Sequence, residues 1–244
     1  MKKIVLYFLM LPVAVYAQTG GSSELDELSE KAVSAYRQLP APLQHLALRL
    51  LENVNCDEKG AYWVYESDTI RNSETIAMEY LEDNKVTEIC NVPFGFSYEK
   101  SKNILFEKYG DCDYFASSKD CIAYRDKSYG GFYFTDLFFM FQSDGETSYF
   151  NKAVLSKDTK TKDEAVSLKK SIDEKLSKQY SLFQIFDDGD TYLSMGGICP
   201  APCERTYGYA ISVDVLKLDK PTRNDCTYAV RIMYGPYDYV EEKF

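Results

Sequence analysis

The sequence predicts an α+β protein, with an N-terminal helical hairpin followed by two units that each combine a helix with an antiparallel strand meander. Three observations lead to this class. Apolar residues recur every three or four positions before Gly60, as in amphipathic helices. After Gly60 they alternate with polar residues, as in half-buried strands. The change from the first spacing to the second then occurs twice more, in 92–160 and in 161–244, which predicts helices packed on one face of a sheet.

The first segment, 1–17, is predicted to be a signal peptide. Lys2 and Lys3 precede an apolar run that ends with the small residue Ala17. The run is shorter than the roughly 20 apolar residues that cross a bilayer. We therefore expect cleavage after Ala17, a disordered lead over 18–23, and a secreted or periplasmic chain with no integral membrane segment after cleavage.

Residues 24–91 are predicted to hold two helices and a hairpin. Helical spacing covers 24–39 and 43–54, with a proline-rich stop between the two segments. Strand-forming residues follow in 61–67. Two further strands, in 75–82 and 86–92, are expected to pair across a turn at 83–85.

The first helix–strand unit is assigned to 92–160. It opens with the corner "FGFS" at 94–97, in which Ser97 is a good N-cap for a helix that buries Leu105 and ends at Gly110. Strands are then expected in 112–117, 121–126, 131–142 and 148–155.

The second unit, 161–244, repeats this order. A helix over 163–178 carries Ile172 on its apolar face. Strands are then expected in 182–186, 191–195, 206–218 and 226–234.

The "FGFS" corner, followed by a helix and antiparallel strands and then by a second such series, resembles the tandem modules of β-lactamase-inhibitory-protein-like and PepSY-like secreted domains. The signal peptide, the many tyrosines and Gln18 also resemble secreted proteins of the Bacteroidetes. The resemblance implies small domains that hold other proteins, and it transfers no catalytic residue.

Charge narrows the classes of partner. The formal net charge is −10, so the surface repels phosphate backbones and the sequence argues against nucleic-acid binding. A protein partner with a basic surface is attracted by the same charge. The alternative is that the acidic residues serve only solubility.

All seven cysteines follow the signal peptide, and an oxidising compartment favours their pairing. Cys199 and Cys203 enclose two prolines, which predicts a rigid loop closed by a structural disulfide rather than a redox-active dithiol. Cys112 and Cys121 are the candidates for a bridge across a hairpin. The odd count leaves at least one cysteine without an intrachain partner, and the full connectivity stays open.

Tyrosine is unusually abundant, with 21 residues. Rings that alternate with other residues on the last strands would form a binding surface, because tyrosine combines a large contact area with a hydroxyl group. The alternative is that they fill the core or cover the sheet edge. The candidate surface consists of Tyr207, Tyr209, Tyr228, Tyr234, Tyr237 and Tyr239.

Catalytic chemistry has little support in the sequence. His45 is the only histidine and lies among leucines, so no nucleophile–histidine pair and no histidine-based zinc site is expected. We nominate no catalytic residue, metal or cofactor. The favoured function is a secreted, non-catalytic protein-binding module, such as an inhibitor or an immunity-like protein. The alternatives are a structural or surface-associated component without a discrete ligand and, third, a thiol or carboxylate enzyme.

Overall fold

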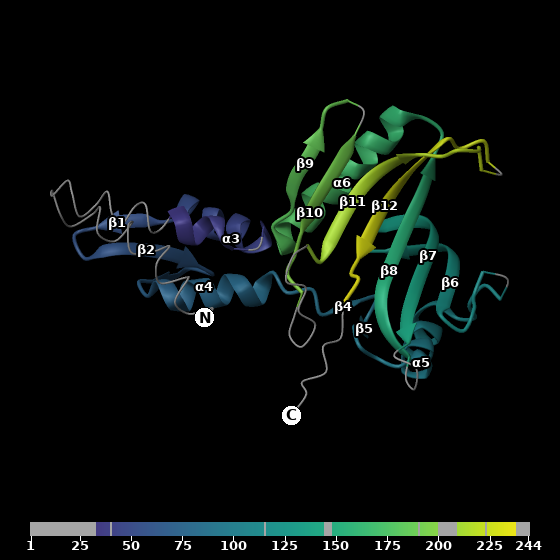
Figure 1. The fold of residues 1–244 in the computed structure, drawn as a ribbon, viewed down its shortest axis with the longest axis horizontal. Coiled ribbons are helices and arrows are strands. Elements are labelled where there is room, and N and C mark those ends of the chain that lie inside the picture. The colour runs from purple at the N-terminus through teal and green to yellow at the C-terminus, as the bar shows by residue number, and fades with distance from the viewer. Residues whose placement is uncertain are drawn as a thin grey trace. The chain divides into compact units, whose positions relative to one another are not determined.

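A computed structural model describes residues 33–39, 41–114, 116–143, 148–189, 191–199, 209–222 and 224–237. The chain forms two compact units, and the boundary between them falls between Asn84 and Lys85. Figure 1 shows the elements of both units. The predicted segments 1–17 and 18–23, together with the start of the first predicted helix, lie outside the described residues.

In its described residues, the first unit packs two helices of about three turns with a small sheet. Residues 33–37 are helical and precede α3. The bounds of the elements are α3 (Ala41–Glu52), β1 (Asn55–Asp57), β2 (Gly60–Tyr65), β3 (Asp68–Ile70) and α4 (Ser73–Asp83). The strands pair in the antiparallel order β1-β2-β3. Trp63 of β2 is buried beside Leu50 of α3, and its indole N–H donates to the Leu50 carbonyl oxygen at 2.8 Å.

Helix α4 corrects the predicted hairpin. The segment 75–82 is helical rather than extended, so the strand expected there is wrong. Ile76 and Ala77 are fully buried in the core around Trp63, and Tyr80 packs against the same core one helical turn later. Residues one and four positions after Ile76 lie on the same side of a helix as Ile76. Their packing against Trp63 therefore favours a helix over the strand that the alternation in 75–82 predicts.

The second unit is built around one large antiparallel sheet. Its elements are β4 (Glu88–Ile89), β5 (Val92–Pro93), α5 (Tyr98–Tyr109), β6 (Cys121–Tyr129), β7 (Phe132–Ser143), β8 (Ser148–Thr159), α6 (Lys162–Tyr180), β9 (Phe183–Asp187), β10 (Tyr192–Gly196), β11 (Ile211–Lys217) and β12 (Tyr228–Tyr234). Seven strands form the sheet in the order β6-β7-β8-β12-β11-β10-β9, while β4 and β5 pair separately. The predicted α+β class with antiparallel pairing is confirmed.

Strand β8 pairs with β12 along seven residues of each strand, from Tyr228 opposite Thr159 to Tyr234 opposite Ala153. This pairing joins the three strands that follow α5 to the four strands that follow α6. Helix α6 runs behind β10, β11 and β12 in Figure 1 and contacts all three. Leu105 of α5 and Ile172 of α6 belong to one hydrophobic core with the strands, so both helices cover the same face of the sheet.

Helices α5 and α6 begin differently. Thr161 caps α6 with a reciprocal capping box, in which its side chain accepts from the Glu164 N–H and the Glu164 carboxylate accepts from the Thr161 N–H. Ser97 stands at the N-cap of α5 with extended backbone, but its side chain makes no capping hydrogen bond. The strand expected in 112–117 is absent from the described part of that segment, which instead folds into turns beside β6.

Candidate functional site

The seven-stranded sheet has two chemically different faces. On the inner face, Ile122, Leu155 and Ile232 are buried against α5 and α6. Side chains alternate along a strand, so residues one position away point to the opposite, outer face. Because α5 and α6 both cover the inner face, no helix among the described residues of this unit covers the outer face.

A row of polar side chains crosses the outer face, and we call it the polar row. Each member lies directly opposite the next in the cross-strand register, so their side chains are neighbours on one face. From β6 to β11 the polar row consists of Arg125, Asp136, Ser156, Arg231 and Asp214. Its charges therefore run positive, negative, neutral, positive, negative.

Ion pairs fix the charged members of the polar row. Arg231 makes a bidentate contact with Asp214, from Nε at 3.1 Å and from Nη2 at 2.6 Å. Arg125 Nε lies 3.7 Å from Asp136 Oδ1 and 3.0 Å from Asp113 Oδ2. The planar guanidinium groups are thus held in place on the sheet before any partner arrives.

The carboxylates on this face are partly withdrawn from water. Desolvation raises the pKa of Asp136, the negative charge of Asp158 raises it further, and Arg125 opposes the shift. Desolvation also raises the pKa of Asp158, against the effect of Lys157. A partner that brings a cation to these carboxylates would gain more than it would from fully solvated groups.

Beside the polar row lies a second, mostly apolar row, which we call the apolar row. It occupies the next outward-facing position of each strand. From β6 to β11 it consists of Ala123, Phe138, Val154, Met233 and Ser212. Phe138, Val154 and Met233 are partly exposed. Large apolar side chains in a contiguous row next to fixed charges are typical of a surface that binds protein.

The predicted tyrosine surface is wrong at Tyr234 and Tyr237, and it stays a prediction at Tyr209 and Tyr228, which are partly exposed. Tyr234 and Tyr237 are 2 % and 1 % exposed, and Tyr228 packs against the same core. Tyr209 is partly buried just before β11. Tyr207 and Tyr239 lie outside the described residues. The alternation expected along β12 is present, but its tyrosines share the inner face with Val230 and Ile232.

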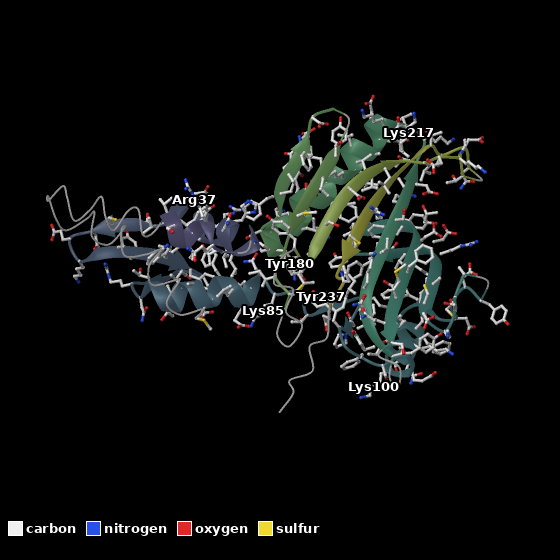
Figure 2. The ribbon with its side chains drawn as sticks, viewed as in Figure 1. Arg37, Lys85, Lys100, Tyr180, Lys217 and Tyr237 are labelled. Atoms are coloured by element: carbon white, nitrogen blue, oxygen red, sulfur yellow. The ribbon has the colours of Figure 1, made fainter. Side chains whose placement is uncertain are left out.

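Tyr237 has a structural role instead, just beyond the end of β12, where Figure 2 labels it. Its hydroxyl donates to the Val86 carbonyl oxygen, and its backbone N–H donates to the Asn151 carbonyl oxygen at 3.0 Å. The Asn151 side-chain amide donates back to the Tyr237 carbonyl oxygen, and the ring stacks on Phe94 with centroids 3.7 Å apart. These contacts fasten the segment after β12 to β8 and to the residues around β5.

Sequence reasoning missed the polar row, although a signal was present. Asp136, Asp214 and Arg231 are each the one charged residue at the centre of an apolar strand segment: "FTDLF", "SVDVL" and "AVRIM". A charge is costly in such a position unless it is paired. Three strands with this pattern indicate charges that meet one another across the sheet.

Several cysteines in the described ranges are thiols in the structure, among them Cys56, Cys90, Cys112, Cys121 and Cys226. Cys112 and Cys121 both raise the pKa of the Tyr98 hydroxyl, after the larger effect of its burial, so both thiols lie near that ring. Their bridge is not formed in the structure and stays a prediction for oxidising conditions. Cys203 lies outside the described residues, so the Cys199–Cys203 loop also stays a prediction.

One buried polar cluster joins α6 to β10 beneath the inner face. The Lys169 ammonium group donates to Asp173 Oδ2 at 2.6 Å and to Ser194 Oγ at 2.5 Å. The Ser194 hydroxyl donates to the same carboxylate oxygen at 2.7 Å. A serine beside a lysine is a known type of nucleophile. Here Ser194 is 2 % exposed and Lys169 is 5 % exposed, so the cluster as it stands links a helix to a strand and offers no surface to a substrate.

The described residues contain no group of three or more His, Cys, Asp or Glu side chains that could hold a metal ion. None of the helices seen there is long and apolar enough to cross a bilayer. Comparison with family models, curated proteins and solved structures finds no match.

Proposed function

We propose that the protein is a binding module for another polypeptide and that the outer face of the seven-stranded sheet is its contact surface. The observation that carries the proposal is the polar row, in which paired charges on neighbouring strands lie beside the apolar row. An apolar strip supplies affinity when it is covered, and fixed charges beside it supply specificity and orientation.

The chemistry of the outer face favours protein over other classes of partner. The polar row has both signs of charge on neighbouring strands about 4.8 Å apart, interrupted only by Ser156 on β8, which suits a second polypeptide surface that also has charges of both signs. Phosphate-rich ligands need an excess of cations, whereas both arginines of the polar row already face carboxylates. In this proposal the chain acts by holding its partner, as an inhibitor or an immunity-like protein does.

We also propose that α5 with β6-β7-β8 and α6 with β9 to β12 are tandem units of one origin. What supports this is that each series has a helix followed by an antiparallel meander, and that the two helices cover the same face.

The test compares two methionine substitutions of equal chemistry. Met233→Lys puts a charge into the apolar row, whereas Met78→Lys puts one on α4, at a side chain that is 50 % exposed. The full chain and both variants are immobilised, and the proteins that they retain from an extract of the producing cells are identified. We expect one polypeptide to be retained by the wild type and by Met78→Lys and lost with Met233→Lys. Identical retention by both variants would contradict the proposal.

The second candidate, a structural component without a discrete ligand, gives a different result in the same experiment. A structural component of this kind retains no polypeptide whose retention is lost with Met233→Lys. Thermal unfolding of each variant accompanies the measurement, because a loss of binding counts only for a variant whose melting transition is retained.

A further inference from the structure

We infer that the polypeptide held by the outer face is a second copy of this chain, packed face to face about a two-fold axis that runs along β8. This inference rests on the proposed function and names the partner. It follows from the order of charges in the polar row and from the place of β8 at the centre of that row.

The polar row is complementary to its own reverse. A two-fold axis along β8 exchanges β6 with β11 and β7 with β12, so the second copy presents the row in the opposite order. Arg125 then faces Asp214 of the other copy, and Asp136 faces Arg231. Ser156, which pairs with both Asp136 and Arg231 in the sheet, lies on the axis and faces its own copy. Each of the four charges therefore meets a charge of opposite sign.

The same axis places apolar side chains on apolar side chains. Phe138 and Met233 flank Val154 in the apolar row, and the rotation brings Phe138 of each copy over Met233 of the other. Val154 meets its own copy on the axis. An isologous interface of this kind needs one self-complementary patch, and the two rows form such a patch.

The charges also select this axis over the other two-fold axis that a face-to-face pair allows. An axis along the polar row, across the strands, would place Arg125 on Arg125 and Asp136 on Asp136. Like charges in direct apposition cost several kcal/mol, so that arrangement is disfavoured. Sheets that pack face to face lie about 10 Å apart with their strands nearly aligned, and both axes give this geometry, so the charges decide between them.

Two residues on the chosen axis meet their own copies with like charge. Asp158 follows the polar row near one end of β8, and Lys152 precedes the apolar row towards the other end. Both lie at the margins of the two rows, and their repulsion opposes the pair and is weakened by salt. Neutralising Asp158 should therefore strengthen the pair. A purely structural role for this residue does not predict that result.

The oligomeric state of the full chain, measured by sedimentation equilibrium, tests the inference. Val154→Arg places two guanidinium groups against each other on the axis, and its matched control is Val64→Arg on β2, where the valine is 58 % exposed. We expect a dimer for the wild type and for Val64→Arg, and a dissociation constant raised at least about tenfold for Val154→Arg. A monomeric wild type, or equal dimerisation by both variants, overturns the inference.

Two isosteric substitutions with opposite expected signs keep the test decisive should Val154→Arg fold poorly. Asp158→Asn removes the repulsion on the axis, so the dissociation constant should fall. Asp214→Asn removes a partner of Arg125 of the other copy, so the constant should rise. Changes of the same sign in both variants overturn the inference.

Cross-linking of Val154→Cys with a short bismaleimide measures the direction of the axis. Mass spectrometry maps the cross-linked peptides and so distinguishes links from position 154 from links between native thiols. An axis along β8 predicts a link between position 154 of both copies. A link from 154 only to residues near 158 would indicate the axis across the strands and would contradict the proposed pair.

Failure of this inference and failure of the proposed function remain distinguishable. A monomeric chain that retains a different polypeptide, with the retention lost in Met233→Lys, supports the proposed function and rejects the second copy. A monomeric chain that retains nothing through the outer face rejects both.

Discussion

Lys169 of α6 donates a hydrogen bond from its ammonium group to the hydroxyl oxygen of Ser194 on β10, over 2.5 Å. Both residues are buried, and Asp173 neutralises the lysine from one helical turn further along α6. One oxygen of that carboxylate, Oδ1, is buried without a hydrogen-bond partner in the structure. The Lys169 ammonium group therefore supplies the counter-charge of the cluster and two of its hydrogen bonds.

The first prediction is that Lys169→Met lowers the free energy of unfolding by about 3 kcal/mol, because it leaves a partly buried carboxylate without its counter-charge. Lys170→Met, at the exposed neighbouring position, is the matched control and should change stability by less than about 0.5 kcal/mol. Urea unfolding followed by circular dichroism measures both. Equal effects of the two substitutions would mean that the buried cluster does not stabilise the fold.

The second prediction concerns the helix faces that cover the sheet. Leu105→Ala and Ile172→Ala should each lower the free energy of unfolding by about 2–5 kcal/mol, because each opens a cavity in a core where the side chain is at most 1 % exposed. Phe106 adjoins Leu105 but is 56 % exposed, so Phe106→Ala serves as the control with a small effect. A melting temperature that falls only in Phe106→Ala would contradict the assigned face of α5.

The third prediction uses Trp63, the one tryptophan of the chain, as a reporter of the first unit. Trp63 and Ile76 share a core that is separate from the core of the large sheet. Ile76→Ala should shift the unfolding transition seen by tryptophan fluorescence, by about 2–5 kcal/mol, more than it shifts the transition seen by circular dichroism. Ile172→Ala should show the reverse order. Coincident transitions in both variants would show that the two cores unfold as one.

Much of the second unit was predictable because its elements are long and strongly patterned. The helix expected over 163–178 is α6, and the four strands expected after it overlap β9 to β12. In such segments local spacing and tertiary packing agree, so the pattern is sufficient. The first unit was harder to predict, because 75–82 satisfies two periods and only its contact with Trp63 selects the helix.

The site was less predictable than the fold for a related reason. Alternation along β12 shows which residues share a face, but not which face carries the helices. Tyr234 therefore looked like part of a binding surface, whereas Arg231 holds the outward position. The register between strands decides which charges meet, and it depends on turns and bulges, such as the irregularity beside Met140 and Phe141, that spacing alone does not reveal.

The last prediction concerns alkaline pH and Cys90, which belongs to the core of the large sheet and has no exposed surface. Burial raises the pKa of its thiol to about 11, although a hydrogen bond from the Tyr109 hydroxyl and the charge of Lys108 partly oppose the shift. In the unfolded chain a thiol titrates near pH 8.5. The folded state therefore keeps this proton at pH values where the unfolded state has lost it, and the resulting stability is complete below about pH 8.5 and is lost as the pH rises through 11.

We accordingly expect the free energy of unfolding to fall between about pH 8.5 and 11, with Cys90 contributing up to about 1.4 kcal/mol per pH unit. The pKa values of Tyr124 and Tyr129 are raised by burial to about 12, whereas tyrosine hydroxyls of the unfolded chain ionise near pH 10. These groups therefore add to the decline only above about pH 10, and the contribution of Cys90 is read between about pH 8.5 and 10. Cys90→Ala should be less stable at pH 7 but should show a flatter decline across the window. Cys56→Ala, which alters an exposed cysteine of the first unit, is the control and should keep the wild-type slope. Urea unfolding at half-unit pH steps measures the slope, and a decline equally steep in Cys90→Ala and in the wild type would show that another group causes it.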